Sequence, residues 1–144
     1  MEIKVKYFDE LSTLELFEIY KARTNVFVVE QNCPYPEVDD IDKRAYHVAV
    51  REGGVIKAYC RVFEKDRETA HMGRVLSTER GKGWGAVVLK AGIDTAKTVM
   101  KKGSLFIEAQ QYAKGFYERE GFVQISDMFL EDGIPHIRMM LDLE

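Results

Sequence analysis

Cysteine is scarce in this sequence, with two residues among 144, and this scarcity limits the chemistry that the chain can carry. Cys33 and Cys60 are isolated, and neither has a partner at the spacing of a metal-ligand pair. Isolated thiols suit a reducing cytoplasm better than a disulfide scaffold. We therefore expect a cytoplasmic protein without a metal site.

Long hydrophobic runs are also missing. A membrane-spanning helix needs about 20 consecutive apolar residues, and no run approaches that length. The first residues, Met1 to Lys6, contain no signal-peptide core. The formal charge is −3, so nothing suggests a surface for nucleic acid. We expect one domain, residues 1–144, with neither a membrane nor a nucleic acid as partner.

What the sequence does have is a glycine-rich loop between a predicted strand, 71–76, and a predicted helix that starts at Trp84. Three glycines occupy every second position, with Arg80 and Lys82 interleaved. Glycine tolerates unusual backbone angles, so such a loop can turn successive N–H groups toward one ligand. The following helix adds unpaired N–H donors and the positive end of its dipole. This arrangement predicts a phosphate site.

Two common phosphate loops do not fit these residues. A Walker loop needs Ser or Thr after its lysine, and Lys82 is followed by Gly83. A dinucleotide fingerprint needs G-x-G-x-x-G and a later acidic residue, and the chain has G-x-G-x-G. The residues alone leave a second interpretation open, in which the loop only turns a strand into a helix.

A second motif follows a predicted strand, 105–109, and reads Gln110-x-x-Ala113-x-x-x-Tyr117-x-x-x-Gly121-Phe122. The glycine loop reads Arg80-Gly81-Lys82-Gly83-Trp84-Gly85. In this order the two stretches resemble the motifs R/Q-x-x-G-x-G/A and N-x-x-A-x-x-x-Y-x-x-x-G-F of the GNAT family of N-acetyltransferases. Gln110 departs from the Asn that is usual in the family.

Two further stretches are similar to the ElaA-like subgroup of this family. One is Arg23-x-x-Val26-Phe27-Val28-Val29-Glu30-Gln31-x-Cys33-Pro34-Tyr35, followed by Asp39-x-x-Asp42, and the other is Glu131-Asp132-Gly133-Ile134-Pro135-His136-Ile137. The resemblance covers most of the chain from Arg23 to Met139. Arg23-x-x-Val26-Phe27 also has a weaker similarity to acyl-homoserine-lactone synthases, which share the general fold, although the chain is short for that group.

The hydrophobic periodicity predicts alternating and apolar strands, and helices between them. Strands are expected over 3–7, 45–51, 55–63, 71–76, 105–109, 122–126 and 136–141, and helices after Ser12 and over 84–101 and 113–120. Prolines break regular structure at 33–36. These elements predict an α/β (α+β) protein with a mixed, mostly antiparallel central sheet of six to seven strands and about four helices, which fits the GNAT fold.

Charged residues in the first third of the chain have two interpretations each. Glu37, Asp39, Asp40 and Asp42 form either a solvated loop or an acidic rim that attracts a cationic acceptor amine. Arg23 falls on or beside the apolar stripe of its helix. Either its stem packs while its head reaches water, or the residue has a functional role.

The resemblance implies that acetyl-CoA is the cosubstrate, and it assigns binding residues by position. Backbone donors of Gly81, Gly83, Gly85 and Ala86, assisted by Arg80 and Lys82, would hold the pyrophosphate. The backbone of Val75, Leu76 and Ser77 would pair with the pantetheine arm, because in the family this strand splays from its neighbour. The other positions that it assigns to the cosubstrate are Trp84, Gln110, Ala113 and Tyr117.

Acylation of an amine requires an unprotonated nitrogen, and about one lysine-like amine in 10³ is free at neutral pH. Catalysis therefore gains from a general base, from donors for the oxyanion and from an acid for the leaving thiolate. Tyr117 occupies the family's general-acid position, although it could simply pack its helix onto the sheet. Glu30, Glu108 and His136 are the candidates for the base, with His47 behind them.

The expected function is that of an acetyl-CoA-dependent N-acetyltransferase. The acetyl group would pass to a primary amine of a small molecule or peptide by direct attack in a ternary complex. One alternative is a non-catalytic acyl-CoA-binding module, and a lesser one is an enzyme like the acyl-homoserine-lactone synthases. The acceptor amine is not identified by the sequence. A homodimer is an open expectation, because dimers are common in the family.

Overall fold

The computed structural model describes residues 1–32 and 35–144, and the predicted break at Cys33 and Pro34 lies outside them. Within these residues, eight strands form one sheet in the order β1-β2-β3-β4-β5-β8-β6, and β7 also pairs with β8. Every pairing is antiparallel except that of β4 with β5, so the expected mixed, mostly antiparallel sheet is confirmed. The strands are β1 (Glu2–Tyr7), β2 (Ala45–Glu52), β3 (Val55–Glu64), β4 (Thr69–Ser77), β5 (Ser104–Gln110), β6 (Val123–Gln124), β7 (Phe129–Glu131) and β8 (Ile134–Asp142).

The described part of the chain has three α-helices rather than the four expected, and several short helical turns. The expected helix 84–101 is α-helical only to Asp94 and continues as a π-helical turn. The predicted strand 122–126 is shorter and is followed by the unpredicted β7. The helical segments are α1 (Thr13–Arg23), α2 (Trp84–Asp94) and α3 (Lys114–Glu118), the π-helical turns η2 (Thr24–Glu30) and η4 (Thr95–Val99), and the 3₁₀ turns η1 (Phe8–Glu10), η3 (Asp40–Arg44) and η5 (Gln111–Ala113).

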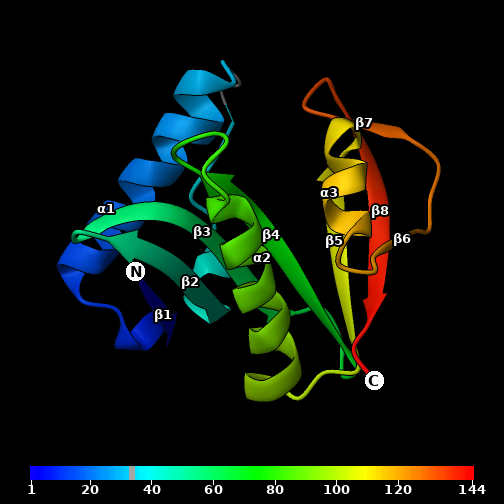
Figure 1. Cartoon of the computed structure of the whole chain (residues 1–144), viewed down its shortest axis with the longest axis horizontal. Coiled ribbons are helices and arrows are strands. Elements are labelled where there is room, and N and C mark those ends of the chain that lie inside the picture. Colours follow the sequence, from blue (N-terminus) through cyan, green and yellow to red (C-terminus); the bar gives the residue numbers. More distant parts are fainter. Residues whose placement is uncertain (33–34) are drawn as a thin grey trace.

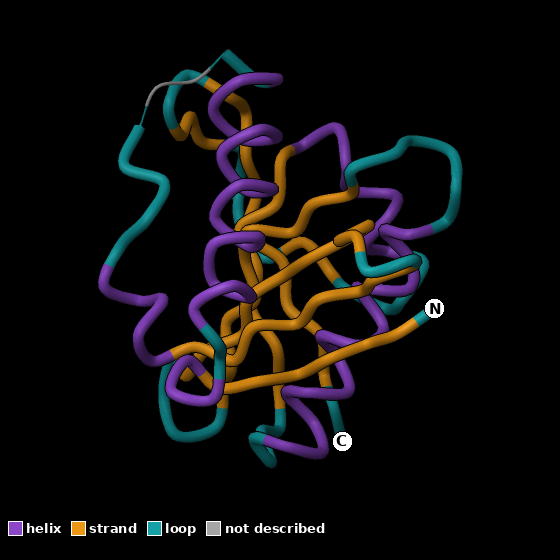
Figure 2. The backbone as a smooth tube through the Cα atoms, turned by 90° about the vertical axis from the view of Figure 1, so that its left-hand side faces the viewer, coloured by secondary structure: helices purple, strands orange, loops and turns teal. Residues whose placement is uncertain are grey.

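Helices cover both faces of the sheet (Figures 1 and 2). On β3, Cys60 points into the core beneath α2 and α3, and Tyr59 points into a smaller core beneath α1. Helix α1 begins where the sequence predicts, because Ser12 Oγ accepts the Glu15 N–H at 3.0 Å and Glu15 accepts the Ser12 N–H at 2.8 Å.

The parallel pairing of β4 and β5 is short. It runs from Thr69 opposite Ser104 to His71 opposite Phe106, after which the two strands separate (Figure 1). In the same part of β4 the register with β3 shifts, and Arg74 adopts a φ of 52°. A non-glycine residue in this left-handed region costs about 1–2 kcal/mol. The bulge at Arg74 lies where β4 has left β5, and it turns the rest of β4 away.

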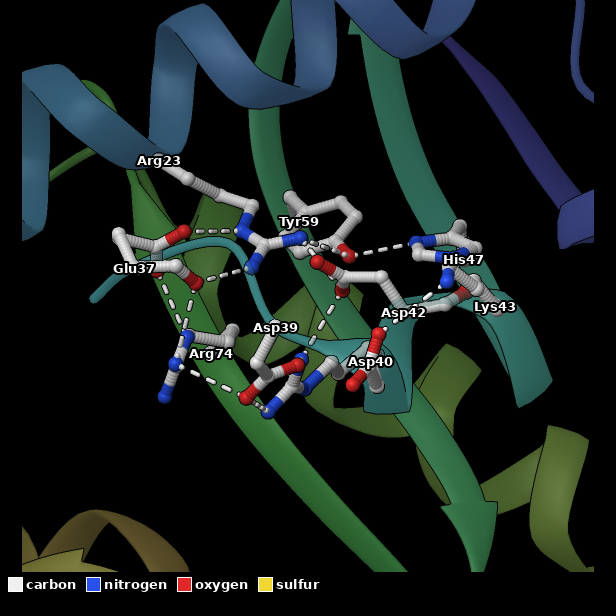
Figure 3. A network of polar contacts seen from close by, with 10 residues as sticks. Arg23, Glu37, Asp39, Asp40, Asp42, Lys43, His47, Tyr59 and Arg74 are labelled. Carbon is white, nitrogen blue, oxygen red and sulfur yellow. Dashed lines mark hydrogen bonds and ion pairs between the residues drawn. The ribbon is translucent and has the colours of Figure 1, made fainter.

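A buried network of charges holds the loop formed by residues 35–44, here called the acidic loop, against β3 and β4 (Figure 3). Arg23 is fully buried, with Nε 2.8 Å from Glu37 Oε2 and Nη1 2.7 Å from Asp42 Oδ1. The interpretation that places the Arg23 head in water is therefore wrong, because the head forms buried ion pairs. Asp40 alone among the four acidic residues fits a solvated loop, with its side chain 96% exposed.

Two more arginines complete the network from the sheet. Arg61 Nη1 lies 2.6 Å from Asp39 and 2.9 Å from Asp42, and Arg74 Nε lies 2.7 Å from Glu37 Oε1. The acidic loop is thus no open anionic rim, because three of its carboxylates face three guanidinium groups.

His47 also belongs to this network. Its Nε2 lies 2.9 Å from the Asp42 carbonyl oxygen and its Nδ1 lies 2.7 Å from the Tyr59 hydroxyl. Burial lowers the pKa of His47. Both ring nitrogens are engaged in hydrogen bonds inside the protein, which disfavours His47 as a catalytic base.

We expect Asp42→Asn to lower the free energy of unfolding at pH 7 by about 3–5 kcal/mol, because it removes one partner of a buried ion pair. Burial alone would raise the pKa of Asp42, but hydrogen bonds and charge from Arg23 and Arg61 hold it below its usual value of 3.8. A carboxyl whose pKa is lowered by folding contributes stability that is lost as the pH falls. The difference between wild type and variant should therefore shrink below about pH 4.

Urea titrations of both proteins at several pH values measure this difference, with Asp40→Asn as the matched control. The control removes the same charge from an exposed position and should leave the midpoint unchanged. Equal stability of wild type and Asp42→Asn at pH 7 would contradict the structural role of the network.

Candidate functional site

A cavity of about 440 Å³ lies where β4 and β5 separate. Its walls come from η2 and the acidic loop on one side, from β5, β7, β8 and the segment before α3 on the other, and from β3 and β4 at its base. The volume falls in the range of small-molecule sites. The splay that the resemblance predicted is thus present, and it opens a cavity of ligand size.

Tyr117, the expected general acid, lines this cavity from α3. Its side chain is packed edge-on against Phe116 and Phe122 and is 8% exposed. No described residue forms a hydrogen bond with its hydroxyl group. Burial raises the pKa of Tyr117 above its usual range, so the phenol stays protonated at neutral pH. A protonated hydroxyl that lines the cavity and has no described protein partner is a group that a ligand there can bind.

Two of the three expected bases also line the cavity. His136 Nδ1 lies 2.7 Å from the Ile134 carbonyl oxygen. A carbonyl can only accept, so Nδ1 donates and Nε2 keeps the lone pair of the neutral ring. His136 Nε2 lies 3.4 Å from Glu131 Oε2. Glu108 lies on the same face of the sheet, with Oε2 3.4 Å from Arg138 Nε.

Glu30 is the third candidate, and the structure keeps it apart from the others. It is the last residue of η2, its side chain is exposed, and it is not among the residues that line the cavity. Of the expected cosubstrate positions, Val75, Gln110 and Ala113 line the cavity with Tyr117. Gln110 Nε2 reaches Gln31 Oε1 at 3.5 Å, a long hydrogen bond that connects the two walls.

The glycine loop follows β4 and leads into α2, outside the cavity. Gly81 and Gly83 have φ angles of 72° and 81°, and a Cβ atom at either position would meet nothing within 4 Å. Backbone conformation, rather than crowding, therefore requires glycine at both. Gly85 differs, because a Cβ atom there would lie 3.5 Å from the Phe116 ring. Arg80 and Lys82 are exposed.

The first turn of α2 leaves backbone donors available. Gly83 is the N-cap and has no side chain to satisfy them, and the N–H groups of Trp84, Gly85 and Ala86 have no acceptor among the described residues. The indole N–H of Trp84 is buried and also lacks a described partner. Leu76 belongs to the core beneath α1, and Ser77 Oγ donates to the Glu79 carbonyl oxygen at 2.8 Å. The loop and helix thus have the donors that an anion requires.

Sequence reasoning missed several residues of the cavity. His71 lies between the rings of Phe63 and Phe106, with ring centroids at 4.6 and 5.0 Å. Asp132, in the turn between β7 and β8, lines the mouth with Glu131. The alternation of β4 was a usable signal for His71, because it places residues 71 and 73 on the face opposite Met72. Asp132 was noted only as part of the stretch that resembles the ElaA-like subgroup, and its place in the cavity was missed because β7 was not predicted.

Comparison with known proteins identifies the same family as the sequence motifs. The family model described as acetyltransferase (GNAT) domain matches residues 18–143. The UPF0039 protein C11D3.02c of Schizosaccharomyces pombe is 42% identical over 99% of this chain and 98% of its own length. ElaA of Escherichia coli is 33% identical over 90% of this chain and 89% of its own length.

Two solved structures are similar over nearly the whole chain. The crystal structure of Escherichia coli ElaA has a TM-score of 0.91 at 31% identity and covers 96% of this chain and 97% of that one. An acyl-CoA N-acyltransferase from Pseudomonas aeruginosa has a TM-score of 0.90 at 31% identity and covers 97% of this chain and 99% of that one.

The fold and the cavity therefore define an acyltransferase that uses an acyl-CoA. The chain belongs to the GNAT family of acetyltransferases, in the ElaA-like subgroup. Among the described residues, no helix is long and apolar enough to cross a membrane.

The environment of His71 leads to a prediction about its protonation. Burial, and secondarily the positive charges of Arg61, Lys65 and Arg44, lower the pKa of His71 to about 4. We expect its ring proton resonances to titrate near pH 4 rather than near 6.5 in an NMR titration. Because folding lowers this pKa, the associated stability should be present above about pH 6.5 and lost as the pH falls toward 4. A midpoint near 6.5 would show that the ring is solvated.

Proposed function

We propose that this protein is an acetyl-CoA-dependent N-acetyltransferase that acetylates a primary amine of a small molecule. The observation that supports this most is the position of Tyr117. Tyr117 lines the cavity at the splay, and its hydroxyl has no partner among the described residues. The strand β4, on the other side of the splay, leads directly into the glycine loop and α2. A ligand that spans loop and cavity needs an anionic end and a reactive end, which suits an acyl-CoA.

The anionic end would lie at the loop. The N–H groups of Gly81, Gly83, Gly85 and Ala86 are proposed to hold the pyrophosphate, with Arg80 and Lys82 beside it. Charge-assisted hydrogen bonds contribute roughly 1.5–3 kcal/mol each, so several together can anchor a coenzyme. The backbone of Val75, Leu76 and Ser77 continues from this point toward the cavity and is proposed to pair with the pantetheine arm. Trp84, Gln110 and Ala113 are proposed to complete the contact surface.

The reactive end would lie beside Tyr117. In the proposed step the amine nitrogen attacks the thioester carbon, the C–N bond forms and the C–S bond breaks. We propose that His136 Nε2 accepts the proton that the amine loses. In the neutral ring, Nδ1 carries the proton and donates a hydrogen bond to the Ile134 carbonyl oxygen, so Nε2 has the lone pair. The sulfur receives its proton from the Tyr117 hydroxyl. Glu30 is not proposed as the base, because it is exposed and does not line the cavity.

Direct attack also fits the one described cysteine. Cys60 is fully buried beneath α2, and burial raises the pKa of its thiol above the usual range. A thiol that stays protonated is a poor nucleophile. An acyl-enzyme at Cys60 is therefore disfavoured, and a ternary complex of protein, acyl-CoA and amine is the simpler scheme.

We expect Gly83→Val to weaken coenzyme A binding at least tenfold, because valine cannot adopt a φ of 81° without strain and the loop donors would move. Isothermal titration calorimetry measures the affinity. Gly53→Val is the matched control, because Gly53 also has a positive φ, 61°, and open space around it, but lies in the β2–β3 turn. Normal coenzyme A binding by Gly83→Val would mean that the loop has only a structural role.

We expect Tyr117→Phe to lower kcat about 100-fold or more, the usual range for loss of a general acid, with little change in coenzyme A affinity. Free thiol released from acetyl-CoA over a panel of amines measures turnover. An unchanged kcat would remove Tyr117 from the mechanism. Binding of acetyl-CoA without thiol release from any amine would favour the non-catalytic module, and release only with S-adenosylmethionine would favour the lactone-synthase-like alternative.

A further inference from the structure

The two walls of the cavity differ in their charge balance. On the wall formed by β3, β4 and the acidic loop, the guanidinium groups of three arginines face the carboxylates of Glu37, Asp39 and Asp42. Three positive and three negative charges cancel, so this wall attracts neither a cation nor an anion strongly.

The opposite wall has unbalanced negative charge. Glu108, Glu131 and Asp132 all line the cavity. Arg138 pairs with Glu108 at 3.4 Å but is 50% exposed and does not line the cavity, and the cations near His71, Lys65 and Arg44, do not line it either. Three carboxylates against one guanidinium leave two negative charges on this wall when His136 is neutral. An ammonium group that enters the cavity is therefore attracted to this side.

Glu131 lies beside the proposed base His136, which leaves Glu108 and Asp132 to bind a cation, and a nitrogen that they hold cannot be the nitrogen that reacts. Neighbouring carboxylates favour the protonated form of an amine, whereas acylation needs the neutral form. Tyr117 identifies the reactive end independently, because the residue is 8% exposed, lines the same cavity and has no described partner for its hydroxyl. The cavity thus offers Glu108 and Asp132 to a permanent cation, and His136 with Tyr117 to the nitrogen under attack.

We propose that the acceptor is a small diamine or polyamine, whose non-reacting ammonium is bound at the wall lined by Glu108 and Asp132 while its other nitrogen is acetylated beside His136 and Tyr117. This inference rests on the proposed function and specifies its substrate class. The cavity volume of about 440 Å³ suits such a molecule together with the acyl end of the cosubstrate.

The test compares two amines that differ by one nitrogen, 1,4-diaminobutane and butylamine. We expect kcat/KM with acetyl-CoA to be at least about tenfold higher for the diamine, which corresponds to one charge-assisted contact. Glu108→Gln and Asp132→Asn should each lower this ratio about fivefold, because each keeps the shape and removes the charge. The preference should also weaken in 0.5 M salt, as the Debye length falls to a few ångströms.

Two controls separate this effect from other causes. Glu52→Gln removes the same charge from an exposed position at the end of β2 and should leave the ratio unchanged. Glu131 is left intact because it contacts His136, so its loss would disturb the proposed base. A wild-type ratio of the two kcat/KM values near one would overturn the proposal. It would also be overturned if Glu108→Gln lowered kcat/KM equally for both amines, because Glu108 would then act as a base.

A failure of the proposed function gives a different result. If neither amine is acetylated, calorimetry on the protein saturated with coenzyme A decides. Tighter binding of 1,4-diaminobutane than of butylamine, weakened in Asp132→Asn, would support the cation site without catalysis. Equal or absent binding of both amines would overturn the cation site itself.

Discussion

The separation of β4 from β5 is the constraint on which the rest of the structure depends. Two adjacent parallel strands normally continue their pairing to the end of the shorter one, since each unpaired N–H and C=O group in the interior is costly. Here the pairing stops at His71, although both strands continue for several residues. The unpaired edges face a cavity instead of each other, so the backbone that a sheet would use internally remains available to a ligand.

The buried charges give this opening a physical cause. Arg74 lies in β4 just beyond the last pair with β5 and has a left-handed backbone, a state that costs free energy unless contacts hold it. Glu37 provides such contacts, with its carboxylate 2.7 Å from Arg74 Nε and its carbonyl oxygen 3.1 Å from Nη2. Glu37 is itself fixed by Arg23. The network thus connects α1, the acidic loop and the bulge, and it stabilises the geometry that separates the two strands.

Much of the architecture could be predicted from the sequence, because it depends on local signals. The capping pair of Ser12 and Glu15, the glycines that need positive φ at 81 and 83, and the alternating strands around Glu52 to Gly54 all lie where periodicity and turn chemistry placed them. The two motifs resembled one family, and the comparisons confirm it.

The roles of the charged residues were harder to predict from the sequence, because they depend on partners that are distant along the chain. From the sequence, Glu37 and Asp42 fit either a solvated loop or a rim that faces the acceptor. In the structure, Arg74 on the sheet neutralises Glu37, and Arg61 neutralises Asp42. The negative charge of the cavity comes instead from Asp132 and its neighbours, in a hairpin whose short strand β7 has little periodicity to detect. A run of charged residues without knowledge of its partners therefore left both a solvated loop and an acidic rim open, and neither describes the paired carboxylates of Glu37, Asp39 and Asp42.

A crystal structure of the protein with acetyl-CoA would test the central claim most directly. It should show the pyrophosphate against the N–H groups of the loop from Gly81 to Ala86, the pantetheine arm along the unpaired edge of β4, and the thioester sulfur within hydrogen-bonding distance of the Tyr117 hydroxyl. A coenzyme bound elsewhere, or β4 and β5 paired along their whole length so that no room is left for the arm, would contradict the account.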